Sequence, residues 1–122
     1  MFNYPWLDEY LTAKTGATKL YKAEWEATLY RLADKMFAMC GGDKEGRPIV
    51  SFKLDPSHGD MLRQQFADII PGYYLNKLHW NSLYLEGIVP DDVVRNMADE
   101  SYHLIYESLS KKKQQEVNSI NN

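Results

Sequence analysis

Six residues that can stack, donate hydrogen bonds or carry charge fall within an eight-residue stretch that follows a Pro-Gly pair. Aromatic rings stack on bases, a lysine offers a cation to a phosphate, and histidine and asparagine add an imidazole and an amide. Stacking of a base on an aromatic side chain contributes about 1–3 kcal/mol. The stretch therefore predicts a surface that can hold a phosphate and a base. Its residues are Tyr73, Tyr74, Asn76, Lys77, His79 and Trp80.

The same stretch also has a purely structural interpretation. Tyr and Trp rings are commonly half-buried with hydrogen-bonded polar tips, and a turn that follows Pro71 and Gly72 favours an Asn for local backbone hydrogen bonds. Ligand binding, in contrast, requires that Lys77 and His79 face solvent. If both are buried and bound to neighbouring protein groups, the stretch shapes the fold and offers no site.

Catalysis is less well supported than binding. A nucleophile beside a base would have to pair Ser51, Ser82 or Cys40 with His79. The sequence around these residues has neither the pattern of a nucleophile elbow nor that of a cysteine protease. A lone cysteine at a strand end is more typical of a small core residue than of a reactive thiol. We therefore expect no catalytic residue and no enzymatic activity.

Metal and cofactor binding are also not expected. The three histidines and the single cysteine are scattered, so no metal-ligand spacing is present. Gly41, Gly42 and Gly46 lack the spacing of a phosphate-binding loop and predict hairpin turns. A lone cysteine cannot form an intramolecular disulfide, and the N-terminus lacks the basic and apolar regions of a secretory signal. We expect a cytoplasmic protein without a membrane span, since no apolar run approaches 18 residues.

Composition predicts one globular domain with an acidic surface. The chain has 122 residues, of which 44% are hydrophobic, enough for one buried core. The formal charge is −3, whereas DNA-binding domains gain non-specific affinity from a positive surface. Global charge thus opposes nucleic-acid binding and leaves only a local patch open. Lys111, Lys112 and Lys113 are weaker electrostatic candidates, because lysines that close a helix are usually solvated.

Hydrophobic periodicity and turn signals predict the order helix, four strands, helix, strand, helix. Asp55 followed by Pro56 is a helix start, because Asp can cap free backbone amides and Pro at the first position needs no donor. Short connections imply antiparallel neighbours, so the fold class is α+β, a two-layer sandwich with helices packed on one face of the sheet. We expect one domain over residues 1–113 and a frayed polar tail over residues 114–122. The expected helices span residues 2–14, 56–67 and 90–110, and the expected strands span residues 19–25, 28–33, 36–40, 48–54 and 78–85.

Four segments resemble, in order and spacing, the signature of the MmcQ/YjbR family: Lys35–Ala38, Ser51–Pro56, Pro71–Trp80 and Glu100–Tyr102. The resemblance implies a bacterial protein with a fold like that of CyaY and frataxin, and a DNA-binding role based on likeness to a double-wing motif. Folds do not fix functions, so that role is an analogy. Likeness to CyaY also suggests iron, but iron prefers clustered carboxylates or imidazoles, which the first helix does not supply.

Two functional hypotheses follow from these features. The first is a small binding module that contacts DNA through Pro71–Trp80. The second is a protein-interaction or regulatory domain, with another protein or a second copy as partner, that uses an exposed aromatic surface and binds no nucleic acid. Aromatic residues make up 13% of the chain, and exposed apolar patches usually mark interfaces. Exposure of Trp25, Tyr30 or Trp80 in one contiguous patch would favour the second hypothesis.

Overall fold

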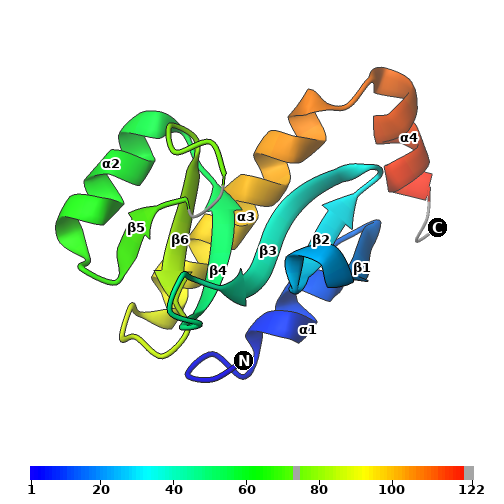
Figure 1. The fold of residues 1–122 in the computed structure, drawn as a ribbon. Coiled ribbons are helices and arrows are strands. Elements are labelled where there is room, and N and C mark those ends of the chain that lie inside the picture. The colour runs from blue at the N-terminus through cyan, green and yellow to red at the C-terminus, as the bar shows by residue number, and fades with distance from the viewer. Residues whose placement is uncertain (73–74, 120–122) are drawn as a thin grey trace.

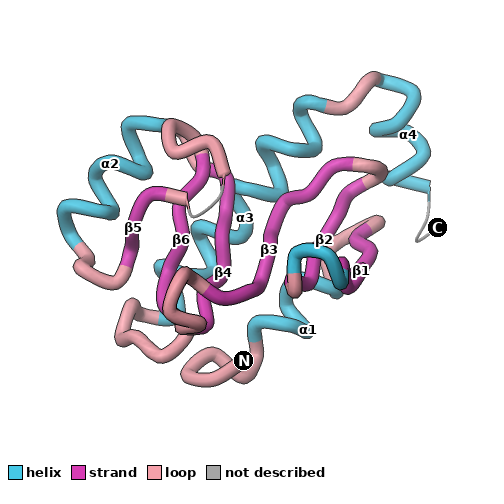
Figure 2. Tube along the Cα trace, in the orientation of Figure 1, coloured by secondary structure: helices cyan, strands magenta, loops and turns pink. Residues whose placement is uncertain are grey.

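The computed structural model describes residues 1–72 and 75–119 and shows a six-stranded antiparallel sheet with its main helices on one face (Figure 1). The predicted two-layer α+β class is confirmed. Loops lie at both ends of the strands (Figure 2). The elements in chain order are α1 (Leu7–Thr12), β1 (Ala17–Lys22), the 3-10 turn η1 (Ala23–Trp25), β2 (Ala27–Leu32), β3 (Lys35–Gly42), β4 (Pro48–Lys53), α2 (Pro56–Gln65), β5 (Ile69–Pro71), β6 (Trp80–Tyr84), α3 (Asp91–Ser108) and α4 (Lys111–Ser119).

The sheet has the strand order β1-β2-β3-β4-β6-β5. The first four strands form the predicted meander, and β6 pairs with β4 so that Val50 faces Leu83. The expected first strand ends earlier than predicted, at Lys22. Residues 23–25 form one 3-10 turn, and Glu26 adopts a left-handed φ of 49°, so the chain reverses before β2. Strand β5 was not predicted, because three residues are too few to show a period.

The first helix is also shorter than predicted. It begins at Leu7 rather than near residue 2, because Phe2 has a positive φ of 49° and Tyr4 anchors the preceding turns. The Tyr4 side chain is buried and its hydroxyl donates to the Val89 carbonyl oxygen at 2.8 Å. At the second helix the predicted cap is confirmed, since the Asp55 carboxylate accepts from the Ser57 amide at 3.0 Å. The aromatic periodicity near the N-terminus thus belongs partly to a turn.

The hydrophobic core lies between the sheet and its helices. Helix α3 crosses behind β2, β3 and β4, and α1 lies beside β1 (Figure 1). Val50, Phe52 and Met97 are fully buried there. A second, smaller apolar cluster is formed by Ala27, Leu29 and Met39 on the other side of the sheet, with Met36 and Leu75 packed against it.

A buried serine joins α3 to two strands where the sheet is irregular. Tyr30 of β2 pairs with Ala38 of β3, and Arg31 of β2 pairs with Met36 of β3. Phe37, which lies between these two residues of β3, has no partner in β2 and forms a β-bulge. The Ser101 hydroxyl donates to the Phe37 carbonyl oxygen at 2.5 Å and accepts from the Lys53 amide at 2.8 Å. One side chain of α3 therefore satisfies backbone groups of both β3 and β4.

The chain end differs from the frayed tail expected after residue 113. Residues 111–119 form α4, and Val117 is 3% exposed and belongs to the main core. The remaining residues of α4 are almost all polar, so the sequence shows no amphipathic period there. None of the described helices is long and apolar enough to cross a bilayer.

Ser101→Ala is expected to lower the free energy of unfolding by about 1–3 kcal/mol, because it leaves a buried carbonyl and an amide without their partner. Urea unfolding followed by circular dichroism measures the change. Ser108→Ala is the matched control, since the Ser108 hydroxyl donates only to the nearby Ile105 carbonyl and accepts from Lys35 at the exposed end of α3. Equal stabilities of the two variants would contradict the role given to Ser101.

Candidate functional site

The stretch selected from the sequence is the loop of the β5–β6 hairpin. The Gly72 amide donates to the Trp80 carbonyl oxygen at 2.7 Å, and the Trp80 amide donates to the Asn76 carbonyl oxygen at 2.9 Å. A Cβ on Gly72 would lie 2.7 Å from the Trp80 Cβ, so only glycine fits this close approach. The Asn76 side chain accepts from the Leu78 amide at 2.9 Å. Asn76 therefore shapes the loop, as the structural interpretation expects.

The loop exposes its lysine and half-buries its imidazole. Lys77 is exposed, with its Nζ 3.4 Å from the Gly72 carbonyl oxygen. His79 is half-buried in the turn before β6, and its carbonyl oxygen accepts from the Leu54 amide at 2.8 Å. Lys77 and His79 are therefore not both buried, and the hairpin loop is kept as a candidate binding site. Tyr73 and Tyr74 lie outside the described residues.

Trp80 and a second lysine lie side by side next to this loop. Trp80 begins β6 directly opposite Lys53 of β4. Both side chains are half-buried, and no carboxylate of the described residues forms an ion pair with Lys53 or with Lys77 of the loop. The structure thus places Lys53 opposite the indole of Trp80 and Lys77 in the adjoining loop, both without an ion pair to a described carboxylate. Whether this group binds a ligand stays a prediction.

The three consecutive lysines lie elsewhere. They begin α4 rather than close α3, on the side of the molecule away from α2 and β5 (Figure 1). Lys111 and Lys112 are exposed, whereas the Lys113 Nζ lies 3.0 Å from an oxygen of Asp34. They form no common surface with the hairpin loop.

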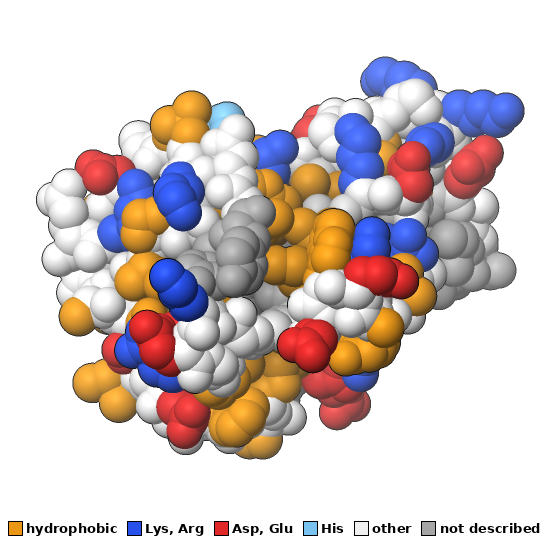
Figure 3. Space-filling view, viewed as in Figure 1, with side chains coloured by type: hydrophobic (Ala, Val, Ile, Leu, Met, Phe, Trp, Pro, Cys, Tyr) orange, Lys and Arg blue, Asp and Glu red, His pale blue; other side chains and the backbone are white. Residues whose placement is uncertain are grey.

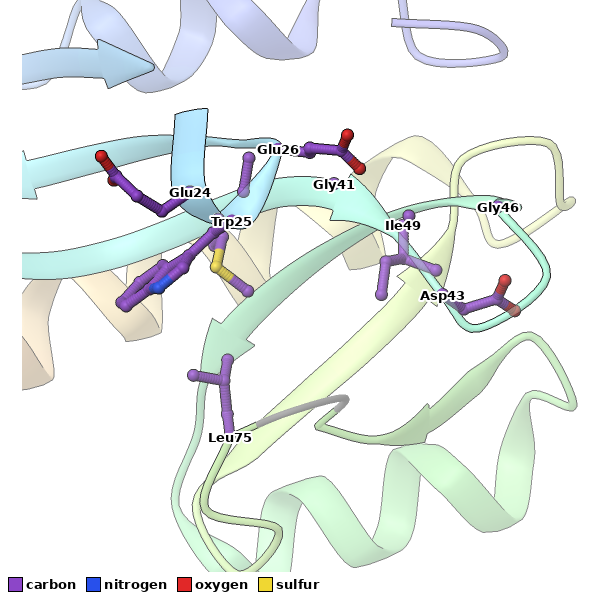
Figure 4. Close-up of a pocket in the computed structure, with 11 residues that line it drawn as sticks. Glu24, Trp25, Glu26, Gly41, Asp43, Gly46, Ile49 and Leu75 are labelled. Atoms are coloured by element: carbon purple, nitrogen blue, oxygen red, sulfur yellow. The ribbon is translucent and has the colours of Figure 1, made fainter. Parts of the chain in front are cut away.

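A groove that sequence reasoning did not find lies on the open face of the sheet, the face not covered by α1 and α3. It has a volume of about 610 Å³, within the usual range of ligand sites. Trp25 of η1 and Leu75 of the hairpin loop approach it from opposite sides (Figure 4). Apolar side chains gather across the hollowed middle of this face (Figure 3). The other lining residues are Glu24, Glu26, Ala27, Met39, Gly41, Gly42, Asp43, Gly46 and Ile49.

Small residues form part of the floor of the groove. Gly41 of β3 pairs with Ile49 of β4 and lies beside Ala27 of β2, where an added Cβ would be 3.4 Å from the Ala27 Cβ. Met39 and Ile49 complete this floor. From the sequence alone, these glycines are predicted to be turn residues. Only the strand register shows that Gly41 forms part of the floor of the groove.

The wall formed by Trp25 is exposed yet held in place. The Trp25 side chain is 54% exposed, and the Lys22 Nζ lies 3.9 Å from its ring centroid. A cation over an indole face is an attractive arrangement. Trp80 is half-buried, but Tyr30 is 2% exposed and its hydroxyl donates to Asp8, so Tyr30 contributes no surface. One feature of the sequence could have indicated this site: Trp25 lies between Glu24 and Glu26 at a turn.

The charged residues lining the groove are all acidic. Asp43 is occupied, because its carboxylate accepts from the Arg47 amide at 2.9 Å and from Arg47 Nε at 2.8 Å. Glu24 and Glu26 are exposed and form no ion pair with a described residue. They lie on either side of Trp25 (Figure 4). Free negative charge therefore accompanies the apolar wall.

The residues considered for nucleophilic chemistry are held in unreactive settings. Burial raises the pKa of the Cys40 thiol to about 12. Its sulfur lies 3.4 Å from that of Met1. Ser51 is fully buried, and its hydroxyl lies 2.6 Å from that of Ser82. This pairing across β4 and β6 lets the two hydroxyls satisfy each other. Among the described residues, no three His, Cys, Asp or Glu side chains come together to hold a metal ion.

The fold defines a small antiparallel α+β domain in which helices cover one face of the sheet and leave the other face open. Comparison with known proteins shows the family to which this domain belongs. Residues 12–104 match the YjbR family model, and the chain belongs to this family. It is 40% identical over 94 residues to YjbR of Escherichia coli, covering 77% of this chain and 79% of that protein. It is 29% identical over 92 residues to YbdF of Escherichia coli, covering 75% of each chain.

Solved structures show the same fold. A crystal structure of a Deinococcus radiodurans protein with a DUF419 domain matches with a TM-score of 0.79 and 26% identity, covering 92% of this chain and 85% of that one. A Pseudomonas syringae protein matches with a TM-score of 0.74 and 20% identity, covering 85% of this chain and 99% of that one. The recognition of the family from its four sequence segments is thus confirmed.

Cys40 is expected to react with a thiol-specific disulfide reagent at pH 8 at least about 100-fold more slowly in the folded protein than in urea, because a pKa near 12 leaves little thiolate. Absorbance of the released thiol measures the rate. Rapid labelling of the folded protein would contradict the burial of Cys40.

The raised pKa of Cys40 also implies that the stability of the protein falls as the pH increases above the pKa of the unfolded thiol, near 8.5. Above that pH the unfolded chain loses the thiol proton readily, whereas the folded chain keeps it.

Proposed function

We propose that this protein is a protein-binding module that receives its partner on the open face of the sheet, at the groove between Trp25 and Leu75. The observation that carries the proposal is an indole that is 54% exposed beside a groove of about 610 Å³ with an apolar floor. Exposing a large ring to water has a cost that a partner can remove. Tryptophan is also enriched among residues that dominate binding energy at interfaces.

One neighbouring residue extends this surface. Leu20 of β1 is 41% exposed and pairs with Leu29 of the small cluster on the open face. Tyr21 is 62% exposed but projects to the opposite face, because successive strand residues alternate. Strand β1 is at the end of the sheet, so in the described part of the chain one of its edges has no strand partner. An exposed apolar residue beside an open sheet edge is typical of protein-interaction sites.

Binding without chemistry is the proposed mode of action. The candidate nucleophiles support this view, because the Cys40 thiol stays protonated near neutral pH and the Ser51 hydroxyl is buried against Ser82. A free thiol of this kind fits a reducing compartment, so we propose the cytoplasm as the place of action.

Photo-crosslinking tests the proposed surface. Trp25→p-benzoylphenylalanine, introduced into cells that naturally produce the protein, is expected to give discrete protein adducts, because the new side chain lies at the groove. The matched control is His103→p-benzoylphenylalanine, at a side chain that is 68% exposed on α3. Adducts are measured by gel mobility and mass spectrometry. Absence of adducts at position 25, or the same adducts from position 103, would contradict the proposal.

DNA binding is a second candidate function, favoured by the exposed Lys77 together with Lys53 and Trp80. Two cations without ion-pair partners in the described part of the chain lie near an indole that is partly accessible. A phosphate and a base require this combination of charge and stacking surface. The acidic net charge of −3 and the free carboxylates of Glu24 and Glu26 oppose it, which is why we rank it second.

If DNA binds here, Lys77→Ala should weaken binding and reduce the slope of log affinity against log salt by about 0.7–0.9, the loss of one phosphate contact. Fluorescence anisotropy with labelled single- and double-stranded oligonucleotides measures both quantities. Lys44→Ala is the control, as Lys44 is exposed in the β3–β4 turn. Replacing Lys111, Lys112 and Lys113 together tests the weaker candidates. No binding at micromolar protein and low salt would remove this second function.

A further inference from the structure

We infer that the groove takes a peptide segment of a partner protein in which an apolar side chain lies between Lys or Arg residues. This inference rests on the proposed function and names the chemistry of the partner. Its basis is the combination of an apolar floor, two facing apolar walls and an acidic rim in one groove. Each of these features restricts a different part of the bound segment.

The walls and floor select an apolar anchor. Trp25 and Leu75 face the groove from opposite sides (Figure 4), and Met39 and Ile49 lie on its floor. Met39 is only 8% exposed, because the small cluster of Ala27, Leu29 and Met39 is packed together with Met36 and Leu75. An apolar side chain that enters between the walls extends an existing apolar cluster. Burial of one such side chain stabilises a complex by removing its surface from water.

The glycines allow the main chain of a partner to come close. Gly41, Gly42 and Gly46 all line the groove. An added Cβ on Gly46 would have no atom within 4 Å, so the space above it is open. Close approach of one backbone to another is a common use of glycine. An extended peptide suits this space, because its main chain can lie over the glycines with a side chain between Trp25 and Leu75.

The rim selects positive charge. Among the described lining residues the charged side chains are Glu24, Glu26 and Asp43, and Asp43 is already bound by Arg47. Glu24 and Glu26 therefore remain to meet cations of a partner, and they flank the Trp25 wall. Lys22 is placed over the indole ring, 3.9 Å from its centroid. Opposite charges on the two sides of an anchor steer association and fix the register of a bound segment.

The same charges argue against nucleic acid at this groove. Phosphates beside two free carboxylates would be repelled. Lys53 lies at the opposite end of β4 from Ile49, whereas Lys77 belongs to the same hairpin loop as Leu75, which lines the groove. The DNA candidate therefore shares the hairpin loop with the groove but not its acidic rim. Glu24 and Glu26 can be changed without altering Lys53 or Lys77.

Selection from a random dodecapeptide phage library on the immobilised full-length chain tests the inference. Enriched sequences are expected to place Lys or Arg on both sides of a Leu, Met, Phe or Trp. Synthetic fluorescein-labelled copies of the enriched peptides are then titrated by anisotropy. The Glu24→Lys, Glu26→Lys double variant is expected to weaken binding about tenfold or more, and Trp25→Ala is expected to weaken it as well.

The matched control is the Glu107→Lys, Glu116→Lys double variant, which makes the same charge change at exposed carboxylates of α3 and α4. It is expected to bind the peptides as the unaltered chain does. All changed side chains are exposed, and circular dichroism verifies folding. No enrichment, enrichment of acidic or uncharged peptides, or an equal loss in the control variant would overturn the inference.

The crosslinking experiment separates this inference from the proposed function. If a partner crosslinks at position 25 and its recovery is unchanged by the Glu24→Lys, Glu26→Lys substitutions, the charge preference is wrong and the binding surface still stands. If position 25 gives no adduct and the library gives no enriched peptide, both are wrong. Oligonucleotide added as competitor should not displace a bound basic peptide, and displacement that depends on Trp25 would favour nucleic acid instead.

Discussion

Val50, Phe52 and Leu83 pack against the helices on one face of the sheet, and this one-sided burial determines where a partner can bind. The residues that alternate with them project to the other face, where the small cluster around Leu29 and Met39 is buried together with Ile49, Ser51 and Ser82. A sheet with one covered face therefore leaves a broad second surface for recognition. The groove, the exposed indole and the hairpin loop all belong to that surface.

Three local constraints keep this surface in shape. The Ser101 hydroxyl holds the bulge at Phe37, so α3 fixes the strands whose other side forms the open face. The close contact of Gly72 with Trp80 fixes the hairpin loop that carries Leu75. The left-handed Glu26 reverses the chain and places Trp25 over β3 and β4. Contacts that hold a binding surface in place before a partner arrives lower the cost of reorganisation on binding.

Much of the fold was predictable because it depends on local signals. Alternation predicted β2, β3, β4 and β6, the Asp55 cap predicted the start of α2, and four segments identified the family. The errors have physical reasons. A three-residue strand such as β5 has no measurable period, and in α4 the burial of Val117 alone leaves no amphipathic pattern. At the N-terminus, aromatic spacing typical of a helix serves a turn anchored by Tyr4.

The sequence by itself determined the fold class, the family and the chemistry available in the loop that starts at Pro71, since these follow from residue order and turn chemistry. Only the tertiary structure decided which of those side chains face solvent, and that Ser51 is buried while Trp25 is exposed. It also brought Trp25 and Leu75, fifty positions apart, to the two sides of one groove. The reason is that the pairing of β4 with β6 and of β6 with β5 joins segments that are distant in the sequence, and this pairing sets which loops meet above the same part of the sheet.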